Sequence, residues 1–442
     1  MRIQLSDHFN AKKLLLFAFP SIIMMVFTSL YSIVDGFFVS NFVGKTPFAA
    51  VNLIMPVIMV LASVGFMFGA GGSALVSKTM GEGDHEKAKR LFSLFVYCTA
   101  ASSVIIAAIA FIFIRPIAVL LGAEGALLEN CIIYGRILLL SLPFYMLQFE
   151  FQSFFITAEK PQLGLIITLI SGVTNMVLDA LFIAVFSWGL VGAAAATAVS
   201  QLLGGMIPVV YFSRPNSSLL RLVKTTFDGK ALVKACVNGS SELMSNISTS
   251  IVSMLYNIQL IKYAGENGVA AYGVLMYVNM IFLGVFIGYS TGTAPIVSYH
   301  YGAQNHSELK GLLRKSLAII GLFAVIMFGA AEILAKPLAG IFVSYDADLM
   351  ALTVRAFRIY SFSFLFASVA IYGSSFFTAL NDGLTSALIS FLRTLLFQVA
   401  AVIILPVLLG IDGIWLSIVI AEIVSALMTF LFLFIKKDRY HY

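Results

Sequence analysis

The sequence predicts an all-α membrane protein with twelve transmembrane helices in two pseudo-symmetric six-helix bundles. Three observations lead to this fold: an apolar composition, regularly spaced hydrophobic segments and an internal repeat. Of the 442 residues, 60% are hydrophobic and 11% are charged, whereas soluble domains have about 25% charged residues. The chain has too little polar surface for a water-soluble globule, so we expect a lipid bilayer around it.

The hydrophobic segments are long enough to cross a membrane, because a spanning helix needs about 20 apolar residues. They lie near residues 14–39, 48–78, 91–114, 130–158, 162–186, 189–212, 231–262, 268–300, 311–335, 352–380, 384–409 and 411–435. Several exceed the thickness of the hydrocarbon core, which indicates tilt, kinks or extensions beyond the bilayer. The first segment carries Asp35 and lacks a small-residue cleavage site, so we interpret it as a helix rather than a removed signal.

An internal repeat relates the two halves of the chain. The sequence Ser77-Lys78-Thr79-Met80-Gly81 recurs 221 residues later as Ser298-Tyr299-His300-Tyr301-Gly302. At the same spacing, the pairs include Gly44 with Gly265 and Gly189 with Gly410. Each copy of the repeated five-residue motif leads into a loop, over 81–86 and 302–306. We interpret both loops as turns before helices rather than metal sites.

The repeat also predicts the domain organisation. We expect an N-terminal six-helix lobe over 1–212, a cytoplasmic linker over 213–229 and a C-terminal six-helix lobe over 230–442. Duplicated bundles are typical of transporters, in which two similar lobes expose one site alternately to the two sides of the membrane.

The basic residues predict the orientation of the chain. They gather in alternate connections, and the positive-inside rule then places both termini in the cytoplasm of a multi-pass cell-membrane protein. This distribution accounts for the net charge of +6 without a nucleic-acid partner, because no basic run is interleaved with aromatic residues. We expect a monomer in the lipid bilayer.

Sequence motifs give no indication of enzymatic activity. No P-loop, H-E-x-x-H or G-x-S-x-G occurs in the chain, which leaves no basis for ATP-driven pumping or for common hydrolase chemistry. The three cysteines, Cys98, Cys131 and Cys236, lack metal-ligand spacing, so we interpret them as packing residues. We expect no cofactor.

Two polar stripes within the predicted helices end in aspartates. The first comprises Thr28, Ser32 and Asp35, and the second comprises Thr168, Ser171, Asn175 and Asp179. Steps of three or four residues place each stripe on one helical face. A charged side chain inside the bilayer costs about 2.5–3.5 kcal/mol, so each acid needs a reason to be there. We expect the two acids to meet and to bind a proton or a small cation; a purely structural pair of buried acids is the alternative.

The second half of the chain has lost both acids. Asp35 corresponds to Tyr256, and Asp179 corresponds to Ala400 or Ala401, depending on one inserted residue. The coupling chemistry is therefore expected in the first lobe alone.

Other candidate residues are less specific. Pro20 predicts a bend in the first helix, about four turns before Asp35. Glu150 has no acidic counterpart, and we expect it to join the coupling network, to attract cationic drugs or to form a structural ion pair. Possible substrate-lining positions are Met55, Met59, Tyr277, Met280 and Asn257. Methionine and aromatic side chains suit flat lipophilic cations through dispersion and cation–π contacts.

These positions resemble the prokaryotic branch of the multidrug and toxic compound extrusion (MATE) family. The likeness covers nearly the whole chain and rests on Pro20 with Asp35, on N-x-x-x-D at Asn175 to Asp179, and on G-x-x-G-A-A-x-A-T at Gly189 to Thr197. The resemblance implies that H⁺ or Na⁺ binds at Asp35, Asn175, Asp179 and Thr197. It also implies a secondary active antiporter that exports lipophilic, often cationic, drugs in exchange for that ion by alternating access.

Two alternatives remain open from the sequence. A lipid-linked oligosaccharide flippase of the same superfamily shares the two-lobed plan but typically needs a more cationic cavity. A passive membrane channel would use the repeat as a scaffold and the acids as a cation path. The sequence also leaves the choice between H⁺ and Na⁺ open, because carboxylate, amide and hydroxyl oxygens serve both ions.

Overall fold

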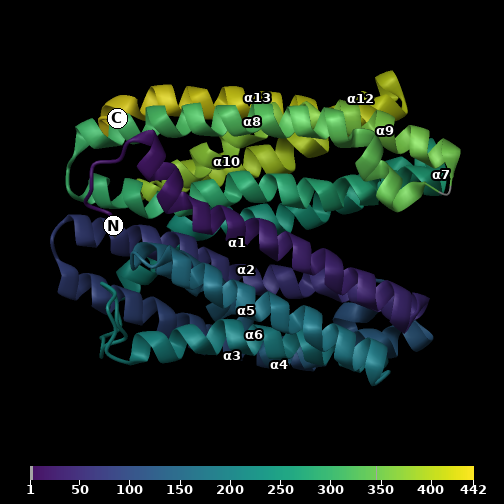
Figure 1. Cartoon of the computed structure of the whole chain (residues 1–442), viewed down its shortest axis with the longest axis horizontal. Helices are drawn as coiled ribbons and strands as arrows, with labels where there is room; N and C mark the ends of the chain where they lie inside the picture. The colour runs from purple at the N-terminus through teal and green to yellow at the C-terminus, as the bar shows by residue number, and fades with distance from the viewer. Residues whose placement is uncertain (1–2, 345) are drawn as a thin grey trace. The chain divides into compact units, whose positions relative to one another are not determined.

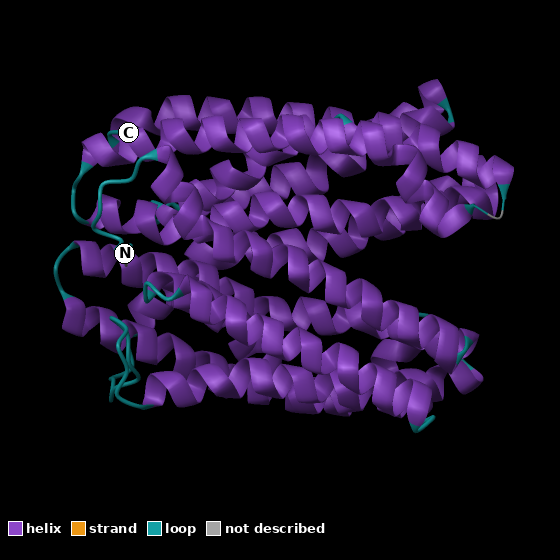
Figure 2. Ribbon diagram, in the orientation of Figure 1, coloured by secondary structure: helices purple, strands orange, loops and turns teal. Residues whose placement is uncertain are grey.

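The computed structural model describes residues 3–344 and 346–442, and the regular structure within them is helical (Figure 2). The elements in chain order are α1 (Ala11–Phe38), η1 (Val39–Val43), α2 (Lys45–Gly81), α3 (His85–Leu120), α4 (Gly125–Thr157), α5 (Pro161–Asp179), η2 (Ala180–Val185), α6 (Gly189–Ser213), α7 (Gly229–Gly302), α8 (His306–Val343), α9 (Ala347–Ser361), α10 (Ser363–Ala379), α11 (Gly383–Phe391), η3 (Leu392–Leu396), α12 (Phe397–Leu409) and α13 (Ile411–Tyr440). The three η elements are short π-helical segments.

The predicted number of twelve spans is confirmed. Among the described residues, ten helices are long and apolar enough to cross a membrane, and the bent pair α9 and α10 makes an eleventh. Helix α7 counts twice, because its 74 residues are interrupted at Gly265 with φ 60° and ψ −150°. Gly44, its repeat counterpart, separates η1 from α2 at φ 111°. Both breaks need a residue without a Cβ atom.

One predicted span differs from a straight helix. The segment 352–380 is expected as one helix, but α9 and α10 meet at an angle of 46° around Phe362. The Ser361 hydroxyl donates hydrogen bonds to the Arg358 carbonyl (2.7 Å) and to Glu332 Oε1 (2.6 Å). A serine that bonds to the preceding turn competes with the backbone ladder and favours a bend.

The chain folds into two compact units. Of the described residues, the first unit holds 3–5 and Phe27–Gly239, and the second holds Ser6–Val26, 240–344 and 346–442. Figure 1 labels α2 to α6 of the first unit and α8, α9, α10, α12 and α13 of the second. Helix α1 is therefore divided between the two units.

Each part of α1 packs within its own unit through glycines. In the second unit, a Cβ atom on Gly288 of α7 would lie 2.5 Å from Ile22 Cα. In the first unit, a Cβ atom on Gly172 of α5 would lie 2.5 Å from the Phe27 ring and 2.7 Å from the Tyr31 ring. These glycines let α1 approach its neighbours closely, which is how helices associate in lipid.

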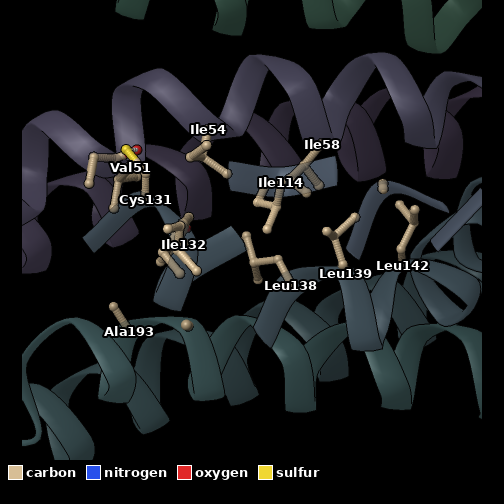
Figure 3. Packing of buried hydrophobic residues seen from close by; sticks show 14 of the residues in the cluster. Val51, Ile54, Ile58, Ile114, Cys131, Ile132, Leu138, Leu139, Leu142 and Ala193 are labelled. Atoms are coloured by element: carbon tan, nitrogen blue, oxygen red, sulfur yellow. Dashed lines mark hydrogen bonds between the residues drawn. The ribbon is translucent and has the colours of Figure 1, made fainter. Parts of the chain in front are cut away.

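Helix α4 forms the centre of the first unit. Figure 3 shows buried side chains from four helices packing together: Ile54 and Ile58 of α2, Ile114 of α3, Leu138, Leu139 and Leu142 of α4, and Ala193 of α6. Gly65 of α2 and Gly205 of α6 lie directly against the α4 backbone, at Met146 and Phe144 respectively. This packing fixes α4 between α2 and α6 and encloses the polar residues along it.

The loops after α2 and after α7 have the same construction. Gly83 and Gln304 take the left-handed conformation at φ 87° and φ 58°. Asp84 and Asn305 then cap the following helices by accepting the N–H groups of Lys87 (3.0 Å) and Glu308 (3.1 Å). The interpretation of these loops as turns before helices is confirmed.

Candidate functional site

Asp35 and Asp179 lie at corresponding ends of their helices in the first unit. Asp35 comes three residues before the end of α1, and Asp179 is the last residue of α5. A π-helical segment follows each helix, and these two segments, η1 and η2, contact each other. Such π turns occur frequently at functional sites.

Close packing of α1 on α5 brings the two acids together. Asp35 lies one turn beyond the Tyr31 ring that covers Gly172, and Asp179 lies two turns beyond Gly172 along α5. The two carboxyl groups are close enough to interact electrostatically. The structure therefore brings the two acids together, and their binding of an ion stays a prediction.

Neither aspartate forms an ion pair with the residues that the structure describes. Asp179 is fully buried, and neither of its oxygens has a hydrogen-bond donor among the described residues. Asp35 is half-buried, and its Oδ1 atom also lacks a donor. Buried carboxylates normally have donors or cations around them. A proton or a small cation would supply what this pair lacks.

Asn175 and Thr197 extend the site on neighbouring helices. The Ser171 hydroxyl of α5 donates a hydrogen bond to the Ser200 carbonyl of α6 (2.7 Å). Because α5 and α6 are consecutive antiparallel helices, Asn175 and Thr197 each lie about one turn beyond this bond, towards Asp179. The side-chain amide of Asn175 and the hydroxyl of Thr197 are buried without partners among the described residues. The arrangement offers two carboxylates, an amide oxygen and a hydroxyl.

This donor set suits a monovalent ion better than a transition metal. Within residues 3–344 and 346–442, no group of three or more His, Cys, Asp or Glu side chains could hold a metal ion. All the candidate ligands are hard oxygen atoms, which bind hard cations rather than soft metals.

Two tyrosines near the acids were not predicted from the sequence. Tyr31 of α1 interacts electrostatically with Asp35, and Tyr134 of α4 interacts with both aspartates. Tyr31 precedes Asp35 by four residues, so the helical period could have placed it on the same face. Tyr134 shares a face of α4 with Ser141, Tyr145 and Gln148, but no sequence signal connects that face to the acids.

The second unit has a different arrangement at the repeat positions. Tyr256, the counterpart of Asp35, is buried and stacks on Tyr272 with ring centroids 5.3 Å apart. An ion pair between Arg393 and Glu422 (2.8 Å) lies inside this unit. The second unit therefore lacks both acids, and the charges of Arg393 and Glu422 inside it neutralise each other.

The remaining candidates are dispersed. Pro20 lies inside the continuous helix α1, and its bend stays a prediction. Met59 accepts a hydrogen bond from Tyr145 at its sulfur (3.1 Å), and Met55 packs at the edge of the same core. Tyr277, Met280 and Asn257 belong to α7 of the second unit, where Tyr277 stacks on Phe342, Met280 is exposed and Asn257 is half-buried. Glu150 is fully buried in α4, away from the aspartates.

A duplicated six-helix bundle with an unpaired acid cluster in one copy defines a multi-pass membrane transporter. The profile of the MatE family matches this chain twice, over residues 20–181 and 243–404. The chain belongs to the MatE family, whose members are transporters rather than enzymes. The two matches coincide with the two copies of the repeat.

Relatives and solved structures agree with this assignment. The multidrug export protein MepA of Staphylococcus aureus strain MSSA476 is 24% identical over 429 residues, covering 97% of this chain and 94% of MepA. MepA of Staphylococcus saprophyticus is 26% identical over 438 residues, with the same coverage. A crystal structure of MATE in complex with MaL6 gives a TM-score of 0.93 at 23% identity, covering 98% of both chains. An outward-facing multidrug resistance MATE transporter gives 0.89 at 24% identity, covering 98% of this chain and 97% of that one. The structural likeness shows the fold.

Proposed function

We propose that the protein is a secondary active multidrug efflux antiporter of the cell membrane. It exports lipophilic, often cationic, small molecules in exchange for H⁺ or Na⁺ by alternating access, as a monomer with both termini in the cytoplasm. The observation that carries the proposal is the pair Asp35 and Asp179, two interacting carboxyl groups without a donor or cation. The names of the Staphylococcus relatives support drug export.

The bound ion acts through the packing of α1 on α5. Two carboxylates at this separation repel each other when both are ionised, and the repulsion is strong where water is excluded. A proton or Na⁺ removes the repulsion and holds the two helix ends together. Occupancy of the pair thus favours one packing of α1, and an empty pair favours another.

The membrane supplies the energy for export. Moving one elementary charge through 100 mV releases about 2.3 kcal/mol, and a concentration gradient of the ion adds to this. A soft surface of methionine and aromatic side chains would bind flat cations without a fixed hydrogen-bond pattern, which fits a broad range of drugs.

The test is drug export from proteoliposomes with ΔpH and Na⁺ gradients imposed separately. We expect saturable export that follows one of the gradients and is lost in Asp35→Asn and Asp179→Asn. Asp228→Asn is the matched control, because Asp228 caps the start of α7 outside the acid pair and asparagine also caps helices. Normal gradient-driven export in both acid variants would overturn the proposal, and flux that ignores both gradients would indicate a passive channel.

A further inference from the structure

A second unpaired carboxylate lies inside the first unit. Glu150 of α4 has no exposed surface, and neither of its oxygens has a hydrogen-bond partner among the described residues. Thr99 of α3 adjoins this carboxyl group. Its hydroxyl is equally buried and has no partner of good geometry.

No positively charged side chain in residues 3–344 and 346–442 pairs with Glu150. An added Cβ atom on Gly69 of α2 would lie 3.1 Å from Glu150 Cα, so α2 closes directly over this part of α4. From α3, the groups that face the carboxyl are Thr99 and Cys98. The Cys98 thiol lies close enough to Glu150 to interact with it electrostatically. A charged carboxylate in such a site carries a large desolvation cost.

Glu150 is separate from the aspartate pair. It lies seven residues before the end of α4 at Thr157, and α5 begins after a short turn at Pro161. Asp179 is eighteen residues further along α5. With a rise of about 1.5 Å per residue, Glu150 and Asp179 are roughly 15 Å apart along the helix direction. Glu150 and the aspartate pair are therefore separate in space.

We propose that Glu150 and Thr99 form a second proton site in the first unit, on its cytoplasmic side. The protonated Glu150 is the neutral form that this buried position accepts, and its O–H group donates to the Thr99 hydroxyl oxygen. One carboxyl and one hydroxyl are too few oxygen ligands for Na⁺, which favours a proton. The placement of this site on the cytoplasmic side, and its role as the cytoplasmic end of a proton path, rest on the proposed antiport function.

Infrared difference spectroscopy of the full-length protein in liposomes tests the proposal. A protonated carboxyl group gives a C=O stretching band that shifts in D₂O. We expect such a band in Asp35→Asn combined with Asp179→Asn, where the aspartate pair no longer contributes, and a loss of its intensity when Glu150→Gln is added. Thr99→Val should shift the band by removing the hydrogen-bond acceptor. Glu129→Gln, an exposed change on the same helix, should leave it unchanged.

The outcomes separate this proposal from the antiporter function. A band that is unchanged when Glu150→Gln is added to the aspartate double variant overturns the second site, as does a Na⁺-dependent carboxylate signal in its place. Should the aspartate variants keep normal export while the Glu150 band is present, the antiport mechanism fails and the proton site stands. In Glu150→Gln we also expect the rate of ΔpH-driven export to become independent of pH. An unchanged pH dependence of the rate contradicts a role of Glu150 in coupling. A thermal melt shows that each variant is folded.

Discussion

Arg393 and Glu422 form a buried ion pair in the second unit, with Arg393 Nε 2.9 Å from Glu422 Oε2 and a terminal guanidinium nitrogen 2.8 Å from Oε1. Their side chains are 14% and 3% exposed. The helices α5 and α11 start 222 residues apart, which aligns Arg393 with Ser171. The second unit thus contains a cation beside the buried Glu422, whereas Asp35 and Asp179 of the first unit have no ion-pair partner among the described residues.

Removing one partner of this pair should be costly. Arg393→Met leaves Glu422 buried without its cation, and we expect a loss of about 3–5 kcal/mol in the free energy of unfolding. Denaturant unfolding in detergent measures the change. The double variant Arg393→Met with Glu422→Leu should recover much of the loss, because no uncompensated charge remains.

The exposed ion pair of Arg355 with Asp412 provides the control. Arg355 is 66% exposed, so Arg355→Met should cost about 1 kcal/mol or less. Equal losses at Arg355 and Arg393 would contradict the dependence on burial.

Close helix packing at Gly71 predicts a second stability effect. A Cβ atom on Gly71 of α2 would lie 2.0 Å from the Ala235 carbonyl, and one on Gly239 would lie 1.9 Å from the Met67 carbonyl. Gly71→Ala must force these backbones apart, and we expect a loss of about 1–3 kcal/mol, seen as a lower melting temperature. Gly321→Ala meets no atom within 4 Å and should be neutral or stabilising. A Gly71→Ala protein as stable as the wild type would disprove the close contact.

The fold was accessible from the sequence because its signals are long-range and redundant. Hydrophobic length predicted the twelve spans, and the gap between the predicted segments 231–262 and 268–300 contains Gly265, where the structure has the break inside α7. The bend near Phe362 was not predicted, because nothing in the sequence shows that Ser361 bonds to the preceding turn and contacts Glu332 of another helix. For the site, steps of three or four residues predicted that Asp35 and Asp179 each share a helical face with other polar residues. Tyr134 and Thr99 escaped notice because their roles come from tertiary packing alone.

Asp382 lies in the turn before α11, and its carboxylate should make the stability of the protein fall at acid pH. Burial opposes ionisation of its carboxyl, but hydrogen bonds from Thr385 (2.8 Å) and Tyr440 and the nearby Lys436 outweigh it, so its pKa lies below the ordinary value. A lowered folded-state pKa stabilises the protein above the unfolded pKa of about 3.9, and this contribution disappears as the pH falls through the folded pKa.

Asp382→Asn should therefore lower stability at neutral pH by on the order of 1 kcal/mol, and the difference from wild type should vanish in acid. Melting temperatures of both proteins between neutral pH and about pH 3 measure the loss at neutral pH and its disappearance in acid. Asp348→Asn, at an exposed position of α9, changes the net charge equally and serves as the control. A constant difference across the range would show that the carboxylate charge is not what stabilises the turn.

The last prediction concerns the choice of ion at the aspartate pair. A proton needs only the two carboxyl groups, whereas Na⁺ needs several oxygen ligands, so Asn175 and Thr197 matter to Na⁺ alone. If Na⁺ is the coupling ion, Asn175→Leu and Thr197→Val should weaken its apparent affinity by about 10-fold or more, as for other metal-site ligands. If the ion is H⁺, both variants should keep ΔpH-driven export near the wild-type rate. Export from proteoliposomes over a Na⁺ series at fixed pH, and over a pH series without Na⁺, measures both cases. Loss of export under both gradients in both variants would contradict this division of roles, since it would make the amide and the hydroxyl essential to the site whichever ion it holds.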